Sequence, residues 1–171
     1  GPQKMDVYSS VPDSTASVVY KKSDVVISDL PLLEAAAAKN SELVILPERF
    51  IDDPYGYGFQ KGSPLRDEFN KAMAKLKAEG FDEKMHDKWI EKSGGEPELI
   101  KQDWEGKNGT LRYWFDAAGD PMAYLGEGGQ FKGMAIDYVL HIAKEMDYRV
   151  DLHECDFDGT VPAVISGKAD I

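Results

Sequence analysis

Histidines and paired carboxylates are the side chains of this sequence that could do acid–base or metal chemistry. His86, His141 and His153 are far apart in the sequence, and none has the HExxH-type spacing of a zinc site. Asp156 and Asp158 lie two residues apart, and we interpret them as the acidic start of a helix rather than as a general acid and base. The residues therefore predict neither a metal site nor an enzyme.

A lone cysteine and a glycine-rich turn add no further chemistry. Cys155 is the only cysteine, which excludes an intrachain disulfide and a cysteine-based zinc site. We expect it to be a small residue at the end of a strand, because no activating motif lies beside it. The sequence GEGG at 126–129 lacks the strand–glycine–helix context of a phosphate-binding loop. No cofactor is therefore predicted.

Length and charge limit the classes of partner. A chain of 171 residues allows one domain of ordinary size. Its formal net charge of -11 and pI near 4.7 argue against nucleic acid, because phosphate binding needs clustered Lys and Arg. No run of about twenty apolar residues is present, so no membrane span is predicted. We interpret Gly1-Pro2 as the remnant of a protease cleavage site.

The N-terminal third alternates strand and helix patterns. Short β-branched and aromatic runs predict strands at 5–9, 24–29 and 43–47. Helices are predicted between these runs, over 12–22 and over the Ala-rich 30–40. This alternation is typical of an α/β fold with a mostly parallel sheet.

The middle third reads as a crossing segment followed by two helices. The sequence PYGYGFQKG at 54–62 predicts an extended segment. Ser63 as N-cap and Pro64 at the first position predict a helix that ends at Gly80. A second amphipathic helix follows over 82–92.

The last third begins after a predicted linker at 93–109, in which apolar side chains could contact a neighbouring surface. A strand is then predicted at 110–116 and a helix at 133–146, with Ile136, Val139, Leu140 and Ala143 on one stripe. A strand at 149–155, a helix at 158–167 and the start of another strand at 169–171 complete the pattern.

The chain also carries an internal echo. The segment from Ala16, ASVVYKKSDVV, aligns without gaps on the segment from Pro162, PAVISGKADI. Each contains a helix end, a basic turn and an aspartate that starts a strand. The echo is consistent with a two-lobed architecture whose halves reuse one α/β unit.

Three blocks of sequence resemble a known family. They are GTLRYWFDAAGDPMAYLGEGGQFKGMAIDYVLHIAKEM, DFDGTVPAVISGKADI, and SDVVISDLPLLEAAAAKN with YGYGFQKGSPLRDEFNKAMAKLKAEG. They are similar to the amino-acid-type extracytoplasmic solute-binding proteins, which are the type II periplasmic binding proteins of bacterial solute-binding family 3. Gly133 and Asp137 take the places of a glycine and an aspartate of the family pattern. The implied fold is α/β, periplasmic-binding-protein-like, in which two lobes close over a solute like a Venus flytrap.

The blocks stand in an order that the family does not use. The resemblance assigns 1–50 to the end part of lobe 2 and 51–92 to the return strand and C-terminal helices of lobe 1. Residues 93–109 are then a linker, and 110–171 are the N-terminal half of lobe 1 of a following unit. This implies either tandem receptors or an incomplete lobe 1 in circularly permuted order, with 54–92 packed against 110–171.

The resemblance also implies ligand-binding residues. Asp29 matches a lobe 2 aspartate that takes the ammonium group of the ligand, although it could instead cap a helix. Asp116 matches a first-loop aspartate at the C-terminal end of a strand, although it could instead serve a turn. Asp120 would favour cationic or polar solutes if it faces the cleft, and Tyr124 could stack on a solute or belong to the core.

The implied function is non-catalytic solute recognition outside the cytoplasm, in the periplasm or at the outer face of the cell membrane. An amino-acid receptor of an ABC importer, which works with a membrane permease, is the first interpretation. A Venus-flytrap sensor region of a membrane signalling protein is the alternative, and an enzyme of the same fold is a third. Residues 5–50 would form a separate piece or exchange with a second copy in a domain-swapped homodimer.

Overall fold

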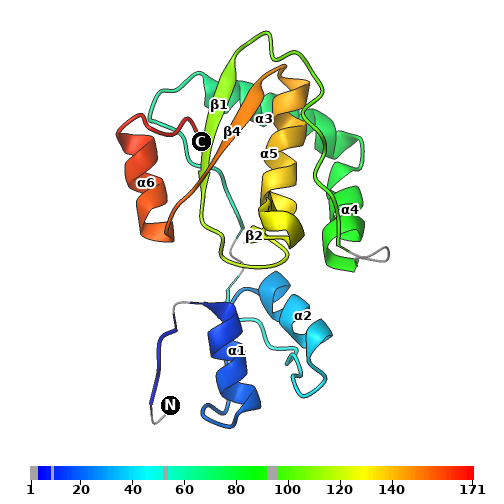
Figure 1. The fold of residues 1–171 in the computed structure, drawn as a ribbon, viewed down its shortest axis with the longest axis vertical. Helices are drawn as coiled ribbons and strands as arrows, with labels where there is room; N and C mark the ends of the chain where they lie inside the picture. The colour runs from blue at the N-terminus through cyan, green and yellow to red at the C-terminus, as the bar shows by residue number, and fades with distance from the viewer. Residues whose placement is uncertain (1–3, 9, 52–53, 92–95) are drawn as a thin grey trace.

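The computed structural model describes residues 4–8, 10–51, 54–91 and 96–171, which form an α/β core and a smaller helical part below it (Figure 1). Residues after 53 build the core, and residues before 52 build the smaller part. None of the helices in the described residues has the length and apolar character needed to cross a membrane.

The core sheet is parallel and is built from the last third of the chain, not from the N-terminal third whose pattern predicted a parallel sheet. Strand β1 (Thr110–Phe115) pairs in parallel with β4 (Arg149–Glu154), in a register that runs from Thr110 opposite Arg149 to Phe115 opposite Glu154. On the other edge of β1, the backbone N–H of Trp114 donates to Ile171 O at 3.0 Å. Asp170 and Ile171 therefore lie beside β1, where a strand was predicted at 169–171, but these residues are not assigned to a strand and the described sheet consists of β1 and β4.

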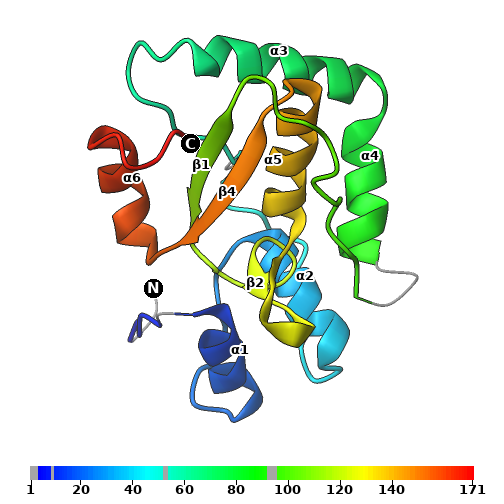
Figure 2. The same ribbon diagram turned by 45° about the horizontal axis from the view of Figure 1, so that its top comes forward.

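Helix α5 (Met134–Glu145) connects the two parallel strands and covers one face of the sheet (Figure 2). The predicted apolar stripe is confirmed, because its four members and Ile142 are buried against β1 and β4. The β-strand side chains alternate accordingly, with Leu111, Tyr113 and Phe115 facing the core.

A short hairpin precedes α5. It consists of β2 (Tyr124–Leu125), the 3-10 turn η2 (Glu127–Gly129) and β3 (Phe131–Lys132). Gly133 follows with φ of 137°, and a Cβ there would lie 2.2 Å from Met122 O. Only glycine fits this position, which gives a physical reason for the family glycine assigned to it.

Two further helical segments pack on the core. Helix α3 (Leu65–Ala78) begins one residue later than predicted, with Pro64 rather than Ser63 at the cap. Helix α4 (Phe81–His86) continues into the π-helical turn η1 (Asp87–Glu91), and the predicted second helix is confirmed over these residues.

The expected packing of the middle third on the last third is confirmed for the described residues. Phe69 of α3 belongs to the same buried cluster as Leu111 and Ile136. Phe81, Met85 and Trp89 form a second buried cluster, against which Met134 and Tyr138 of α5 pack. The two stretches of sequence therefore share one hydrophobic core.

A buried carboxylate joins these pieces. Asp137 on α5 is fully buried, and its Oδ2 accepts hydrogen bonds from Lys88 Nζ at 2.6 Å and from Trp89 Nε1 at 2.9 Å. Its Oδ1 accepts from the backbone N–H of Ile100 at 3.1 Å. His141, one turn further on α5, places Nε2 3.8 Å from Oδ1. Three segments far apart in sequence thus meet at a single side chain.

Residues 96–109 form no helix or strand, yet they follow the surface of the core closely. Trp104 Nε1 donates to Tyr148 O at 2.6 Å. The Gln102 side chain donates from Nε2 to Val150 O at 3.0 Å, and its Oε1 accepts from the backbone N–H of Val150 at 2.7 Å. The described part of the predicted linker is therefore anchored, and its remainder lies outside the described residues.

The N-terminal part contains helices α1 (Val11–Val19) and α2 (Leu30–Lys39), which pack against each other. Ser10 caps α1 by accepting the N–H of Asp13 at 3.2 Å.

The prediction of strands in the N-terminal part is wrong for the described residues, which form no strand there. Residues 5–8, 24–29 and 43–47 have no ladder partner, and Val25 and Ile27 are 62% and 71% exposed. β-branched residues favour a strand only when a neighbouring strand supplies hydrogen bonds and a surface to pack on. Residue 9, the last residue of the first predicted strand, lies outside the described residues.

The internal repeat seen in the sequence corresponds to a repeated helix-end turn in the structure. Helix α6 (Phe157–Ile165) and helix α1 end in the same type of turn. In both turns the residue of positive φ, Gly167 or Lys21, donates its N–H to the carbonyl three residues earlier, and the next residue donates to the carbonyl five residues earlier. Asp170 then accepts from Arg112, whereas the equivalent Asp24 begins the unpaired 24–29 segment.

Replacing Asp137 by Asn tests the buried carboxylate. We expect D137N to lower the free energy of unfolding by about 3 kcal/mol, because Lys88 loses its counter-charge and an amide cannot accept at both oxygens. Urea unfolding followed by tryptophan fluorescence measures the change. The exposed Asp158 is the matched control, and D158N should change stability by less than about 0.5 kcal/mol. Equal stability of the two variants would contradict the expectation.

Candidate functional site

The carboxyl edge of the sheet is acidic. Asp116 directly follows β1, Glu154 ends β4, and Asp156 precedes α6. Because the strands are parallel, all three lie at one edge. Burial, and next the negative charge of Asp156, raise the pKa of the Asp116 carboxyl. This is the edge at which open α/β sheets bind ligands, so the positional expectation for Asp116 agrees with the structure.

Cys155 lies at the same edge, at the end of a strand as expected. Its N–H donates to Phe115 O at 3.0 Å. Burial raises the pKa of its thiol, and the negative charges of Glu154, Asp116 and Asp156 act in the same direction. A thiol with a raised pKa is mostly protonated, which does not favour a nucleophile.

A cavity of about 680 Å³ opens beside this edge, between β1, α6 and the extended residues 55–59. Its wall is mostly aromatic and aliphatic, and Asp116 is one of the few charged residues on it. The indole Nε1 of Trp114 is buried without a hydrogen-bond partner, and its ring stacks on His153 at 5.3 Å.

Asp29 lies outside both described cavities. It occupies the N-cap position of α2, but its side chain makes no capping hydrogen bond. Instead Asp29 Oδ2 accepts from Tyr55 Oη at 2.8 Å, and Tyr55 lines the 680 Å³ cavity. Asp29 therefore occupies the capping position that was the alternative to a ligand role, but its carboxylate does not cap the helix.

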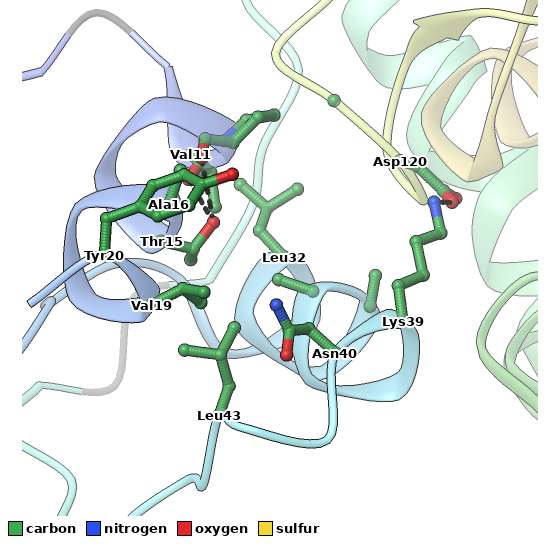
Figure 3. Close-up of a pocket in the computed structure, with 14 residues that line it drawn as sticks. Val11, Thr15, Ala16, Val19, Tyr20, Leu32, Lys39, Asn40, Leu43 and Asp120 are labelled. Atoms are coloured by element: carbon green, nitrogen blue, oxygen red, sulfur yellow. Dashed lines mark hydrogen bonds and ion pairs between the residues drawn. The ribbon is translucent and has the colours of Figure 1, made fainter.

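Asp120 lines a second cavity, of about 310 Å³, between α1, α2 and the loop at 119–120. Figure 3 shows its carboxylate facing the ammonium group of Lys39. Lys39 Nζ lies 2.6 Å from Asp120 Oδ2, in an ion pair that joins residues 81 positions apart.

Tyr124 packs at the edge of the cluster formed by Phe81, Met85 and Trp89. Burial raises the pKa of its hydroxyl, and the negative charges of Asp120 and Glu96 add to this effect. Tyr124 lines neither described cavity. Its place in the structure corresponds to the core alternative.

The four predicted residues are therefore not gathered in one described cavity. Sequence spacing gave no signal for Lys39 or Tyr55, because each is paired with a residue distant in the sequence. The ligand roles of the four residues stay predictions.

The three histidines remain separate, as their spacing predicts. Burial lowers the pKa of His141, and the nearby Asp137 carboxylate acts in the opposite direction. Among the described residues, His86, Asp87 and Glu91 are the group whose ligand atoms could approach one metal ion, lying within 4.8 Å of one another. All three are exposed, and nothing else in the structure points to an ion there.

Comparison with known proteins gives a family match for the last third of the chain. Residues 111–171 match the model of the family described as bacterial extracellular solute-binding proteins, family 3. Glutamate [NMDA] receptor subunit 1 of Drosophila melanogaster, of Drosophila ananassae and of Drosophila persimilis is 36% identical to this chain over 83 residues. The match covers 48% of this chain and 8% of each relative.

These matches confirm the resemblance over the last third of the chain and imply a periplasmic-binding-protein-like α/β fold there. They support a ligand-binding role and an extracytoplasmic location. The aligned stretch spans less than a tenth of the matched receptor subunits.

The raised pKa of Asp116 predicts a pH-dependent stability. A partly buried carboxyl whose pKa is raised by the fold destabilises the folded state above that pKa, where the group is charged. This penalty disappears below the ordinary pKa of 3.8, where the carboxyl is protonated in both states. We therefore expect D116N to be more stable than the natural chain at pH 7, with the gain lost near pH 3. Urea unfolding across this range measures it, with D158N as control. A D116N variant that is less stable at pH 7 would contradict the expectation.

Proposed function

We propose, from the premise that residues 111–171 match extracellular solute-binding family 3, that this chain is a segment of an amino-acid receptor serving an ABC importer. The observation that carries the proposal is the acidic carboxyl edge of a family-matched sheet, with Asp116 directly after β1. A carboxylate there suits the ammonium group of an amino acid or of a related small polar solute.

The domain order is part of the proposal. Residues 54–91 and 110–171 share one core, which supports their assignment to a single lobe 1 built in permuted order. Residues 96–109 then join the end of one receptor unit to the start of the next. The N-terminal helices, with Asp29, are the end part of a lobe 2.

Binding of amino acids by the complete parent protein tests the function. We expect calorimetry with an amino-acid panel to find at least one ligand, and D116N to weaken its binding about tenfold or more, because a charge-assisted hydrogen bond is lost. D158N should bind as the natural protein does. Absence of binding by every amino acid and related polar solute, or turnover of the bound compound, would contradict the proposal.

A sensor region of a membrane signalling protein is the second candidate function. The similarity of half of the chain to a named receptor subunit favours it. The order of modules in the parent protein distinguishes the two: an adjoining permease indicates transport, and a membrane helix followed by a signalling module indicates sensing.

We also propose that this chain forms a domain-swapped homodimer through its N-terminal part. The segment 24–29 follows a turn of the same type as the one that precedes Asp170 and Ile171. Unlike Ile171, it has no strand beside it, and it exposes the alternate apolar side chains of Val25 and Ile27. Unpaired strand-type segments are templates for a second chain. Pairing in a dimer would give the segment the ladder partner that it lacks in one copy.

Light scattering during size exclusion tests the dimer. We expect a concentration-dependent dimer of the natural chain, and a shift to monomer in the V25K/I27K variant, because charged side chains would face the partner. Leu125 has a similar exposure, 60%, in the hairpin of the core, so L125K is the matched control and should still dimerise. A monomer at every concentration would contradict this proposal.

A further inference from the structure

The 310 Å³ cavity has the shape of a small ligand site with one charged end. Helix α1 supplies one apolar wall and helix α2 the opposite one, as Figure 3 shows. The aliphatic members of the wall are Val11, Ala16, Val19, Leu32, Ala35, Ala36 and Leu43. The volume is at the lower end of the range for small-molecule sites. Such a wall suits the hydrocarbon part of a ligand.

The charged end is the Asp120 carboxylate. The Asp120 side chain is only 16% exposed, whereas its partner Lys39 is 68% exposed. Among the ion pairs of the described residues, Lys39–Asp120 is the one that connects residues 4–51 to residues 96–171. The mostly buried member of this pair is the anion, and the exposed member is the cation.

Lys39 lines the same cavity and is itself a four-carbon chain that ends in an ammonium group. The protein therefore already places an alkylammonium group against Asp120. We propose that this cavity binds a primary alkylammonium compound with a short apolar body, and that Lys39 is a tethered stand-in which such a ligand displaces. The inference takes up the expectation from the sequence that Asp120 is a ligand residue, goes beyond the proposed role of Asp116, and adds the ligand class.

Displacement of Lys39 is feasible because of what each partner gains. An ion pair with one largely exposed member is weak, so little is lost when Lys39 turns to solvent. A free ligand keeps the same charge-assisted hydrogen bond to Asp120. It also buries methylenes against the α1 and α2 walls, with an expected gain of about fourfold in affinity for each one. The net charge of -11 further favours the approach of cations.

Titration of the 171-residue chain with n-butyl-, n-pentyl- and n-hexylammonium, followed by NMR shifts of backbone amides, tests the inference. We expect saturable shifts at Gly119, Asp120 and Leu43, with affinity rising about fourfold for each methylene. Hexanol and hexanoate share the hydrocarbon part and should not produce these shifts, because neither can replace the ammonium group.

Two variants separate the roles of the ion-pair partners. K39M keeps the aliphatic stem and removes the competing charge, so it should bind hexylammonium up to about fivefold more tightly. D120N should bind it at least about tenfold more weakly. The controls K71M and D158N alter exposed residues that line neither cavity, and they should bind as the natural chain does. Because Lys39 is exposed, K39M is expected to fold even if D120N does not.

The inference is overturned if hexylammonium causes no saturable shift at these residues in the natural chain and in K39M. It is also overturned if hexanol binds equally well, since the cavity would then be an apolar packing gap between α1 and α2. Amino-acid binding by the parent protein without alkylammonium binding here would refute the stand-in role and leave the receptor function intact. Alkylammonium binding here without amino-acid binding by the parent would support the stand-in role and refute the receptor function.

Discussion

The buried carboxylate of Asp137 is the constraint on which the core depends. A charged group without exposure to water must be paired and hydrogen-bonded, or the fold is strongly destabilised. Its partners are Lys88 and Trp89 from the helical segment before the linker region and the backbone of Ile100 within it. All three must be in place at once, so segments that are distant in the chain are locked into one unit. The middle third and the last third of the chain are thereby held in one packed unit.

The same unit positions the acidic edge. Asp137 lies in the first turn of α5, and Gly133, just before that helix, allows the close approach of Met122. The 119–123 loop is held against the start of α5, where the N–H groups of Met134 and Ala135 donate to Pro121 O and Met122 O. Asp116 and Asp120 therefore lie on a short loop with both ends held by the core. Asp120 reaches the N-terminal helices and Asp116 stays with the sheet. The two carboxylates serve different cavities as a result.

Much of the core could be predicted from sequence, because local patterns decide it. The apolar stripe of α5 has a helical period, and the strands on either side alternate, so their burial follows directly. The lack of strands in the described N-terminal residues could not be predicted, since Val25 and Ile27 have strand propensity and only the structure shows that they have no ladder partner. The contacts Lys39–Asp120 and Tyr55–Asp29 leave no trace in sequence spacing. Asp137 was matched to a family position, but only the structure shows its three donors.

Hydrogen exchange in the native state tests most directly whether Asp137 unites the core. The indole N–H of Trp89 and the backbone N–H of Ile100 both donate to it, and the N–H groups of β1 report on the sheet. If the carboxylate joins all three segments into one cooperative unit, these groups exchange only through global unfolding, with the same opening free energy. Exchange of Trp89 and Ile100 through a much smaller opening than that of β1 would contradict the account.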